Sequence, residues 1–252
     1  MYKQNLNRMK SISCIFKNKF KVNWIFAFLL ISLAFSCNGK KKYHDLTENK
    51  SVQDVTNSIA DILKFQKEIN EEYKNPETSP LYDKDRKDFE SLAFFKPDTT
   101  YRIVAKFVRT PNAIPFLMPT TTNRKSEEVV YGIAYFKLEA KEYQLEVYQN
   151  PELTAQEKYR DYLFLPFLDM TNGKESYTGG RYIDLKIPEG DSIQIDFNKA
   201  YNPYCAYNKK YSCPIVPKVN TLNTAIHAGV LKNKIPILLS IGILIKLQYY
   251  FL

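Results

Sequence analysis

The spacing of apolar residues changes once along the chain, from a helical period to a strand period. In residues 51–74, "SVQDVTNSIADILKFQKEINEEYK", apolar side chains recur three and four positions apart, which places them on one face of a helix. Ser51 with Asp54 resembles a capping box, and Asn75–Pro76 closes the segment. The pattern predicts one amphipathic helix, preceded by a polar linker and followed by a short helical turn around 85–92.

From Tyr101 onward, apolar and polar residues alternate with a period of two. The alternation is found in six segments rich in aromatic and β-branched residues, separated by Pro, Asn, Gly or Asp: 101–109, 128–139, 142–149, 161–169, 181–187 and 192–197. "LEAKEYQLEVY" predicts a tight hairpin. Because no run between these segments is long enough for a second layer of helices, we predict a mainly β fold. It is an antiparallel β-sandwich or a partly open barrel, with the N-terminal amphipathic helix packed on it.

The first 36 residues have the order of a secretory signal. A basic stretch ends at Lys21, and the apolar run "VNWIFAFLLISLAF" of 14 residues follows. This run is shorter than the ~20 residues that span a bilayer, which favours a cleaved signal over an uncleaved anchor. "LAFSC" resembles a bacterial lipobox, in which Cys37 becomes the lipidated first residue of the mature protein. We therefore expect a signal peptide over 1–36, a tether over 37–50, and a lipoprotein anchored to a membrane of the cell envelope that faces the periplasm.

The chain ends in a second apolar stretch. Residues 230–252 read "VLKNKIPILLSIGILIKLQYYFL", in which Pro236, Lys246 and Gln248 interrupt the run. Such a segment is marginal as a membrane span, so it is either a frameshifted or eroded gene end or a second anchor. We assign the folded domain to 51–229 and leave this tail outside it.

The net charge of +9 does not indicate a nucleic-acid-binding protein, because of where the charges lie. Residues 1–36 carry six basic and no acidic side chains, and residues 230–252 carry three more basic ones and no acid. The net charge of 37–229 is therefore zero. A nucleic-acid footprint needs basic charge gathered on the folded domain. We expect the membrane, through the lipid, as a partner, and no nucleic acid.

Two motifs in the second half of the chain carry a family resemblance. They are "FLPFLDMTNGKESYTGGRYIDL" and "DFNKAYNPYCAYNKKYSCP", with Pro217, Asn220 and Ile226 after them and "SPL" at 79–81 before them. These residues resemble the DUF1684 family, a domain of unknown function, in a Bacteroidota-like lipoprotein form. The resemblance spans about residues 55–229. It implies a shared fold and a shared site, and it assigns no activity.

Two aspartates stand at matching places in the last two predicted strands. The alternation is satisfied by a hairpin that turns at 189–191 and sets Asp184 opposite Asp196. Opposed carboxylates repel each other, so this arrangement requires a shared proton, a cation or an arginine such as Arg181. The pair is either a metal-binding or acid–base site or two solvated aspartates on an outer face.

Arg181 and Asn198 complete the catalytic candidates beside the two aspartates. Arg181 falls on the apolar parity of its strand, so it is either a strand-start residue bent away or a buried arginine paired to a carboxylate. The histidines, His44 and His227, are accompanied by no nucleophile-elbow pattern. No metal-binding, phosphate-binding or dinucleotide-binding motif occurs, so we expect no metal and no cofactor.

Side chains of the same motifs are candidates for binding a small molecule: Tyr182, Tyr201, Asn202 and Tyr207. Tyrosine rings stack on planar ligands, yet tyrosines in such a loop also pack over the end of a sheet. Two classes of function stay open. One is an envelope lipoprotein of unknown activity with a ligand-binding or structural β domain, and the other is a small hydrolase or metal-dependent enzyme that uses the aspartates with Arg181.

After Cys14 leaves with the signal and Cys37 takes the lipid, the exported domain keeps Cys205 and Cys213. An even pair in an oxidising compartment favours a disulfide. Two packed thiols and a metal are the alternatives, although two cysteines with at most His227 fall short of the four ligands of a closed zinc site. We predict a disulfide between Cys205 and Cys213.

Overall fold

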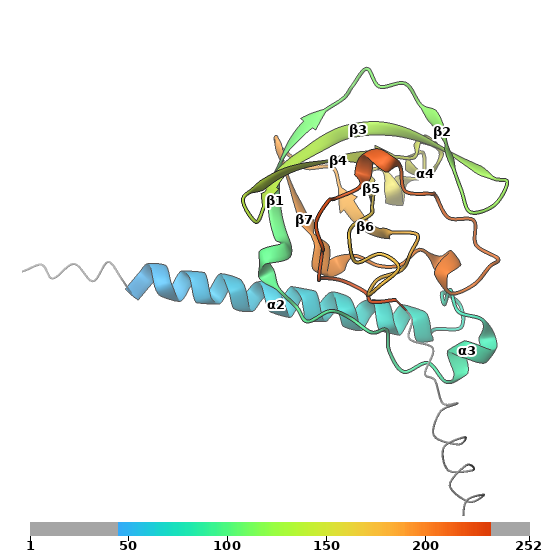
Figure 1. Cartoon of the computed structure of the whole chain (residues 1–252), viewed down its shortest axis with the longest axis horizontal. Coiled ribbons are helices and arrows are strands. Elements are labelled where there is room, and N and C mark those ends of the chain that lie inside the picture. The colour runs from blue at the N-terminus through green and yellow to red at the C-terminus, as the bar shows by residue number, and fades with distance from the viewer. Residues whose placement is uncertain (1–44, 233–252) are drawn as a thin grey trace, which may run out of the picture. The chain divides into compact units, whose positions relative to one another are not determined.

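One antiparallel sheet curls into a nearly closed barrel in the structure, a computed structural model that describes residues 45–232 (Figure 1). Its strands are β1 (Arg102–Arg109), β2 (Phe116–Pro119), β3 (Lys125–Leu138), β4 (Lys141–Gln149), β5 (Tyr162–Phe167), β6 (Arg181–Lys186) and β7 (Ser192–Asp196). They are ordered β6-β5-β4-β3-β1-β7, with β2 paired to β3 outside this path. The predicted mainly β fold is confirmed, and of its two forms the partly open barrel is the one observed. Strand β2 was not predicted.

Three α-helices and five short 3₁₀ turns accompany the sheet within the described part of the chain. They are α2 (Asp45–Lys74), α3 (Asp83–Lys87) and α4 (Pro151–Thr154), with η1 (Thr99–Tyr101), η2 (Glu157–Tyr159), η3 (Phe197–Lys199), η4 (Tyr204–Ala206) and η5 (Lys218–Asn220). Helix α2 ends where Asn75–Pro76 predicts but begins six residues before Ser51. The segment that was expected to be a linker is thus helical from residue 45. Its residues "DLTENK" include Leu, Glu and Lys, which are good helix formers.

The chain divides into two units, residues 1–50 and 51–252, and all the strands of the barrel belong to the second. Its part of α2 packs through one apolar cluster, in which Ile69 and Tyr73 meet Leu81, Tyr207 and Val230. Polar contacts hold the same helix, because the Tyr204 hydroxyl donates to Glu72 Oε1 at 2.6 Å. The packed amphipathic helix predicted from the apolar spacing is confirmed.

The barrel interior is filled by alternate residues of the strands, such as Leu145 and Val147 of β4 and Leu163 and Leu165 of β5. Strands β3 and β4 meet in the tight hairpin that the sequence predicts. Its two turn residues, Glu139 and Ala140, have φ values of 49° and 63°. Positive φ at both central positions gives a turn whose twist matches that of the flanking strands.

The predicted hairpin of the last two strands is wrong. Strand β6 pairs with β5, where Asp184 stands opposite Phe164, and β7 pairs with β1, where Asp196 stands opposite Arg102. The free edge of β6 instead meets the chain after β7, through the bridge between Tyr182 and Tyr201, whose backbone N–H and C=O groups exchange hydrogen bonds of 2.9 Å. Alternation fixes which face of a strand is buried. It does not determine the neighbour, because any strand that buries the same face can pair with it.

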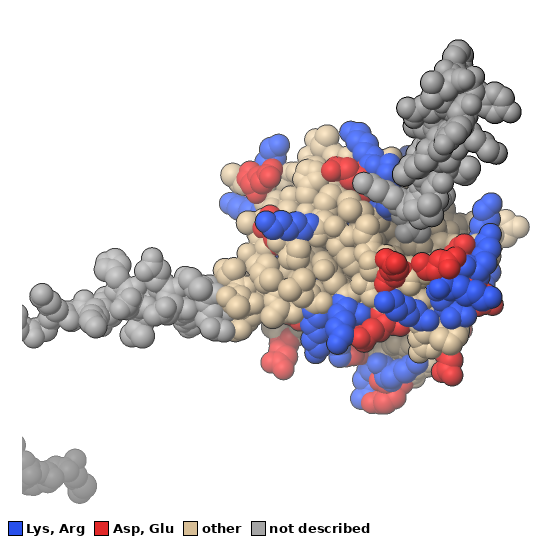
Figure 2. All heavy atoms as spheres, turned by 90° about the horizontal axis from the view of Figure 1, so that it is seen from below, with Lys and Arg blue, Asp and Glu red and all other residues tan. Residues whose placement is uncertain are grey.

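Charged side chains of both signs share the surface. On α2, Lys64 pairs with Glu68 and Lys67 with Glu71, each at 3.7 Å. The face seen in Figure 2 likewise carries basic and acidic side chains next to one another. This face therefore presents no extended field of a single sign.

Both ends of the chain lie outside the described residues. The expected signal peptide, the lipid on Cys37, residues 37–44 of the tether and residues 233–252 of the tail all belong to those ends. At the start of the tail, Val230 is fully buried and its N–H donates to the Ala200 carbonyl at 2.8 Å. Within residues 45–232, no helix has the length and apolar character needed to span a bilayer.

Candidate functional site

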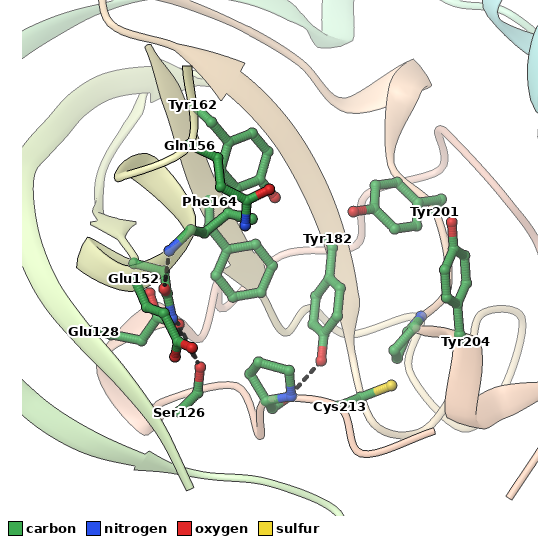
Figure 3. Close-up of a pocket in the computed structure, with 14 residues that line it drawn as sticks. Ser126, Glu128, Glu152, Gln156, Tyr162, Phe164, Tyr182, Tyr201, Tyr204 and Cys213 are labelled. Carbon is green, nitrogen blue, oxygen red and sulfur yellow. Dashed lines mark hydrogen bonds between the residues drawn. The ribbon is translucent and has the colours of Figure 1, made fainter. Parts of the chain in front are cut away.

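A pocket of about 470 Å³ opens on the face of β5 and β6 that is turned away from the barrel core (Figure 3). Strand β5, "YLFLPF", is apolar along its whole length, so it buries both faces. Leu163 and Leu165 enter the core, while Tyr162 and Phe164 point to the pocket. The remaining walls come from β3, the segment around α4, β6 and the loop after β7: Ser126, Glu128, Asn150, Glu152, Leu153, Gln156, Tyr182, Tyr201, Pro203, Tyr204, Cys213 and Pro214.

Aromatic rings form the continuous part of the wall. The rings of Phe164 and Tyr182 meet edge to face with centroids 4.8 Å apart, and those of Tyr182 and Tyr201 do so at 6.0 Å. Figure 3 shows Phe164 and Tyr182 side by side in the middle of the pocket, with Tyr201 and Tyr204 at one end. The Tyr182 hydroxyl donates to the Pro214 carbonyl, which fixes the ring to the loop. Two of the predicted binding residues, Tyr182 and Tyr201, therefore line a pocket.

Asp184 receives two tyrosine hydroxyls beside this aromatic wall. Its Oδ1 accepts hydrogen bonds from Tyr162 at 2.8 Å and from Tyr201 at 2.7 Å. The carboxylate remains accessible to solvent, yet protein surrounds it on most sides. This partial desolvation raises its pKa, and the two hydrogen bonds oppose the rise. Asp184 thus positions two rings of the pocket wall.

Glu128 brings a buried carboxyl to the opposite part of the wall. Its side chain accepts at Oε1 from Ser126 Oγ at 2.8 Å and from Asn150 Nδ2 at 3.2 Å. Its Oε2 is enclosed and has no hydrogen-bond partner among the described residues. Burial raises the pKa of Glu128, and the bonds from Asn150 and Ser126 oppose this. A buried acceptor without a donor is costly, which marks Glu128 as a functional candidate.

A β-bulge at Tyr131 aims Glu128 at the pocket. Val130 pairs with Tyr148 on the outer face, whereas Gly132 pairs with Val147 on the core face, with Tyr131 as the extra residue between them. One extra residue in a strand shifts the alternation by one position, so residues on the far side of the bulge point to the opposite face of the sheet. Glu128 is an even number of positions from the core residues of β3, so simple alternation would place it in the core. A charged residue at such a position was the sequence signal that could have identified it.

Asn150 holds Glu128 in place and starts α4. Its Oδ1 accepts from the Leu153 N–H at 2.8 Å, which caps the helix, and Pro151 occupies the first turn. Its Nδ2 donates to the Glu127 carbonyl at 2.9 Å, as well as to Glu128. The same amide thus fixes the backbone of β3, the carboxyl of Glu128 and the segment that closes the pocket.

Cys213 lines the pocket and Cys205 lies beside it, but both are free thiols. The predicted disulfide is not formed in the structure. The Cys205 N–H donates to Cys213 Sγ at 3.2 Å. A hydrogen bond from the Cys213 thiol lowers the pKa of Cys205 to about 6, and the same contact raises the pKa of Cys213. The spacing of the cysteines correctly indicates their proximity, and the arrangement is the packed-thiol alternative.

Arg181 is a fully buried arginine paired to a carboxylate, one of the two alternatives that the sequence leaves open. Its Nη2 donates to Asp169 Oδ2 at 2.7 Å and to the Ile226 carbonyl at 2.9 Å, and its Nη1 donates to the Ala228 carbonyl. Burial lowers its pKa, and Asp169 opposes this. These contacts hold the C-terminal segment against β6.

The remaining catalytic candidates make structural contacts elsewhere. Asp196 Oδ1 caps η3 by accepting from the Asn198 N–H at 3.0 Å. The Asn198 side chain bonds the backbone N–H and C=O of Asp98 at 2.9 and 2.8 Å. Because Asp184 and Asp196 lie on strands that do not pair, the predicted carboxylate pair is not formed. Arg181, Asp184 and Asp196 therefore do not form one site.

The last two binding candidates also lie outside the pocket wall. Asn202 is buried, and its Nδ2 donates to the Tyr207 hydroxyl and to the Leu231 carbonyl, each at 3.1 Å. Tyr207 packs under α2, where its ring meets Tyr73 edge to face at 5.2 Å. Among residues 45–232, no three His, Cys, Asp or Glu side chains are grouped closely enough to hold a metal ion.

Together these features define an antiparallel β-barrel domain with an aromatic, acid-bearing pocket on its outer face. The family model described as "Protein of unknown function (DUF1684)" matches residues 87–231, and the chain belongs to this family. A solved relative is an uncharacterised protein of Haloarcula marismortui, whose structure was determined in solution by NMR. It is 31% identical, with a TM-score of 0.53, over 73% of this chain and 95% of that one. No curated protein matches the chain.

The buried ion pair predicts a strong effect on stability. Arg181→Met leaves the Asp169 carboxylate buried and unpaired, so the free energy of unfolding should fall by about 3–5 kcal/mol. Adding Asp169→Asn should recover part of the loss, because the amide oxygen still accepts from Thr171 and Ile226 N–H. Denaturant unfolding measures both.

The matched control for this cycle is Lys186→Met on the same strand. Lys186 and Asp161 form an exposed pair at 2.9 Å, and its loss should change stability by less than about 1 kcal/mol. Equal effects at Arg181 and Lys186, or no recovery in the double variant, would contradict the assignment.

The raised pKa of Glu128 predicts that Glu128→Gln stabilises the protein in a pH-dependent way. Below the reference value of 4.5, the carboxyl is protonated in folded and unfolded chains alike, and the two proteins should have similar stability. As the pH rises above this value, the unfolded chain ionises first, so the wild type loses stability relative to the variant. At neutral pH the variant should therefore be the more stable of the two proteins, and the difference should disappear at acidic pH.

Thermal unfolding across pH measures this gain. Glu127→Gln is the control, since Glu127 is the adjacent residue of β3 and its side chain is exposed. A variant of Glu128 that is less stable at neutral pH than at acidic pH, relative to wild type, would show that the carboxyl stabilises the fold.

Proposed function

We propose that this chain is a cell-envelope lipoprotein whose β domain binds a small organic molecule in the aromatic pocket. The observation that carries the binding role is a pocket of about 470 Å³ with aromatic walls and one buried carboxyl oxygen that lacks a donor. Its volume falls in the range of ~300–1,000 Å³ typical of small-molecule sites. Apolar walls with a few fixed polar groups are likewise typical of such sites.

The placement of polar groups supports binding rather than a solely structural role for this region. The Asp184, Tyr162 and Tyr201 side chains satisfy one another, so this side of the pocket is prearranged. Glu128 is held by Ser126 and Asn150 but keeps an unsatisfied oxygen. A preformed wall lowers the entropy cost of ordering side chains when a ligand binds.

The second class of function, a hydrolase or metal-dependent enzyme built on the two aspartates and Arg181, has less support. The guanidinium of Arg181 is directed to Asp169 and two carbonyls, and Asp196 caps a 3₁₀ turn. A catalytic constellation requires its groups to lie within reach of one reacting atom. The binding role therefore accounts better for the arrangement of these side chains.

The envelope location rests on the order of charged and apolar residues at the N-terminus and on the lipobox-like "LAFSC". We expect mass spectrometry of the membrane fraction to find Cys37 as a lipid-modified first residue. Cys37→Ser should abolish this modification and leave residues 1–36 attached. Recovery of wild-type protein that still carries residues 1–36 would refute the lipoprotein part of the proposal, without bearing on the pocket.

Occlusion of the pocket tests the binding role. Leu153 lines the pocket from α4, and its N–H rather than its side chain is used by the Asn150 cap. Leu153→Trp should fill the space and weaken binding of a small neutral probe, benzyl alcohol, by about tenfold or more, which corresponds to ~1.4 kcal/mol. Isothermal titration calorimetry of the full-length protein measures the affinity.

The control for occlusion is Val104→Trp, because Val104 is 70% exposed on β1 and takes no part in the pocket. This variant should bind the probe as the wild type does. If the wild type does not bind, or if Leu153→Trp binds as well as the wild type, the pocket is not the ligand site.

A further inference from the structure

The charged side chains that line the pocket all have one sign. Of its fourteen lining residues, Glu128 and Glu152 are acidic and none is Lys, Arg or His. A third carboxylate, Asp184, lies behind two of the lining tyrosines. Arg124 lies near enough to Glu128 to favour its ionised form, but it is not among the lining residues. An anionic ligand would therefore face repulsion from carboxylates of the wall, with no cation in the lining itself to offset it.

The aromatic residues strengthen this preference. Five rings line the pocket: Tyr162, Phe164, Tyr182, Tyr201 and Tyr204. Aromatic faces are electronegative and attract cations, most strongly where water is excluded. The same rings offer flat apolar surface against which a ring of the ligand can pack.

The unsatisfied oxygen of Glu128 defines what the ligand should donate. Glu128 is 3% exposed, and the donors of Ser126 and Asn150 are both directed to Oε1. No donor among the described residues reaches Oε2, so this oxygen has no hydrogen-bond partner. An N–H carried by a ligand would satisfy it, and a positive charge on that nitrogen would also favour the ionised carboxylate.

Acid and rings are arranged in sequence across the pocket. Figure 3 shows Glu128 and Glu152 on one side, Phe164 and Tyr182 in the middle, and Tyr201 and Tyr204 on the other side. A ligand that satisfies all three parts has a nitrogen donor at one end and a flat apolar body beyond it.

We infer that the pocket selects an organic cation, a protonated primary or secondary amine joined to a ring, whose N–H donates to the Glu128 carboxylate. This inference rests on the proposed binding role and adds the charge and chemical class of the ligand. The rings of the pocket hold the body of the ligand, and Glu128 distinguishes the ammonium from neutral and anionic analogues of the same shape.

Three probes of similar size, each a benzene ring with one polar group, test the charge preference. They are benzylamine, which is protonated at neutral pH, benzyl alcohol, which is neutral, and benzoate, which is anionic. Calorimetry uses the full-length protein in lipid nanodiscs, with empty nanodiscs as the blank. A charge-assisted hydrogen bond contributes about 1.5–3 kcal/mol, so benzylamine should bind about tenfold to a hundredfold more tightly than benzyl alcohol, and benzoate should bind most weakly.

Two variants test whether Glu128 is responsible. In Glu128→Gln, benzylamine should bind no more tightly than benzyl alcohol, because the carboxylate that favours the ammonium is gone. Glu127→Gln, which alters the adjacent exposed carboxylate, should keep the full preference for benzylamine. The affinity ratio of the wild type tests the charge preference independently of how the Glu128 variant folds.

Each other outcome overturns a specific part. If the three probes bind equally, or if benzoate binds most tightly, the cation inference is wrong while the binding role stands. If the preference for benzylamine survives Glu128→Gln in a folded variant, the assignment to Glu128 is wrong. If no probe binds, the inference fails together with the proposed binding role.

Discussion

The buried ion pair between Arg181 and Asp169 is the contact on which the rest of the domain depends. Both side chains are completely buried, 2.7 Å apart. An isolated charge in such a place is strongly unfavourable, so each group requires the other. Arg181 also binds the carbonyls of Ile226 and Ala228, and Asp169 Oδ1 accepts from the N–H of Thr171 and Ile226. The pair thereby joins the start of β6, the turn after β5 and the end of the domain.

The ion pair also fixes the position of the pocket wall on β6. Tyr182 and Asp184 follow Arg181 on β6, so the residue that secures the strand also fixes the side chains that form the wall. Gly180 precedes them at a φ of +89°, and a Cβ there would lie 2.7 Å from the Phe167 carbonyl. Glycine is therefore required where the turn enters β6. Much of the family motif around this strand is explained by support of the fold rather than by contact with a ligand.

A second constraint, the bulge at Tyr131, decides where the acidic group lies. Ahead of the bulge, Ser126 and Glu128 face the pocket, and beyond it the same parity faces the core. If Tyr131 instead paired as a regular residue of the strand, Glu128 would point into the apolar interior of the barrel, where no partner compensates a carboxylate. The bulge thus combines a continuous core with an acidic pocket wall on one strand.

The sequence by itself determined the class of the fold, because the period of the apolar pattern reports which surface each element buries. It identified the packed helix, six of the seven strands, the hairpin at Glu139–Ala140 and the proximity of Cys205 to Cys213. It also marked Tyr182 and Tyr201, which line the pocket. These features depend on local spacing or on motifs that are continuous in the chain.

Only the tertiary structure decided which strands are neighbours and which polar groups meet. Asp184 accepts hydrogen bonds from tyrosines and does not lie opposite Asp196, because β6 pairs with β5 and β7 pairs with β1. The alternation of apolar residues is the same for either choice of neighbour. Glu128 of β3 accepts a hydrogen bond from Asn150, which follows β4. The two residues are 22 positions apart, so no short sequence motif contains both. The pocket is formed by segments distant in sequence, so its residues could be recognised only after the barrel had brought them together.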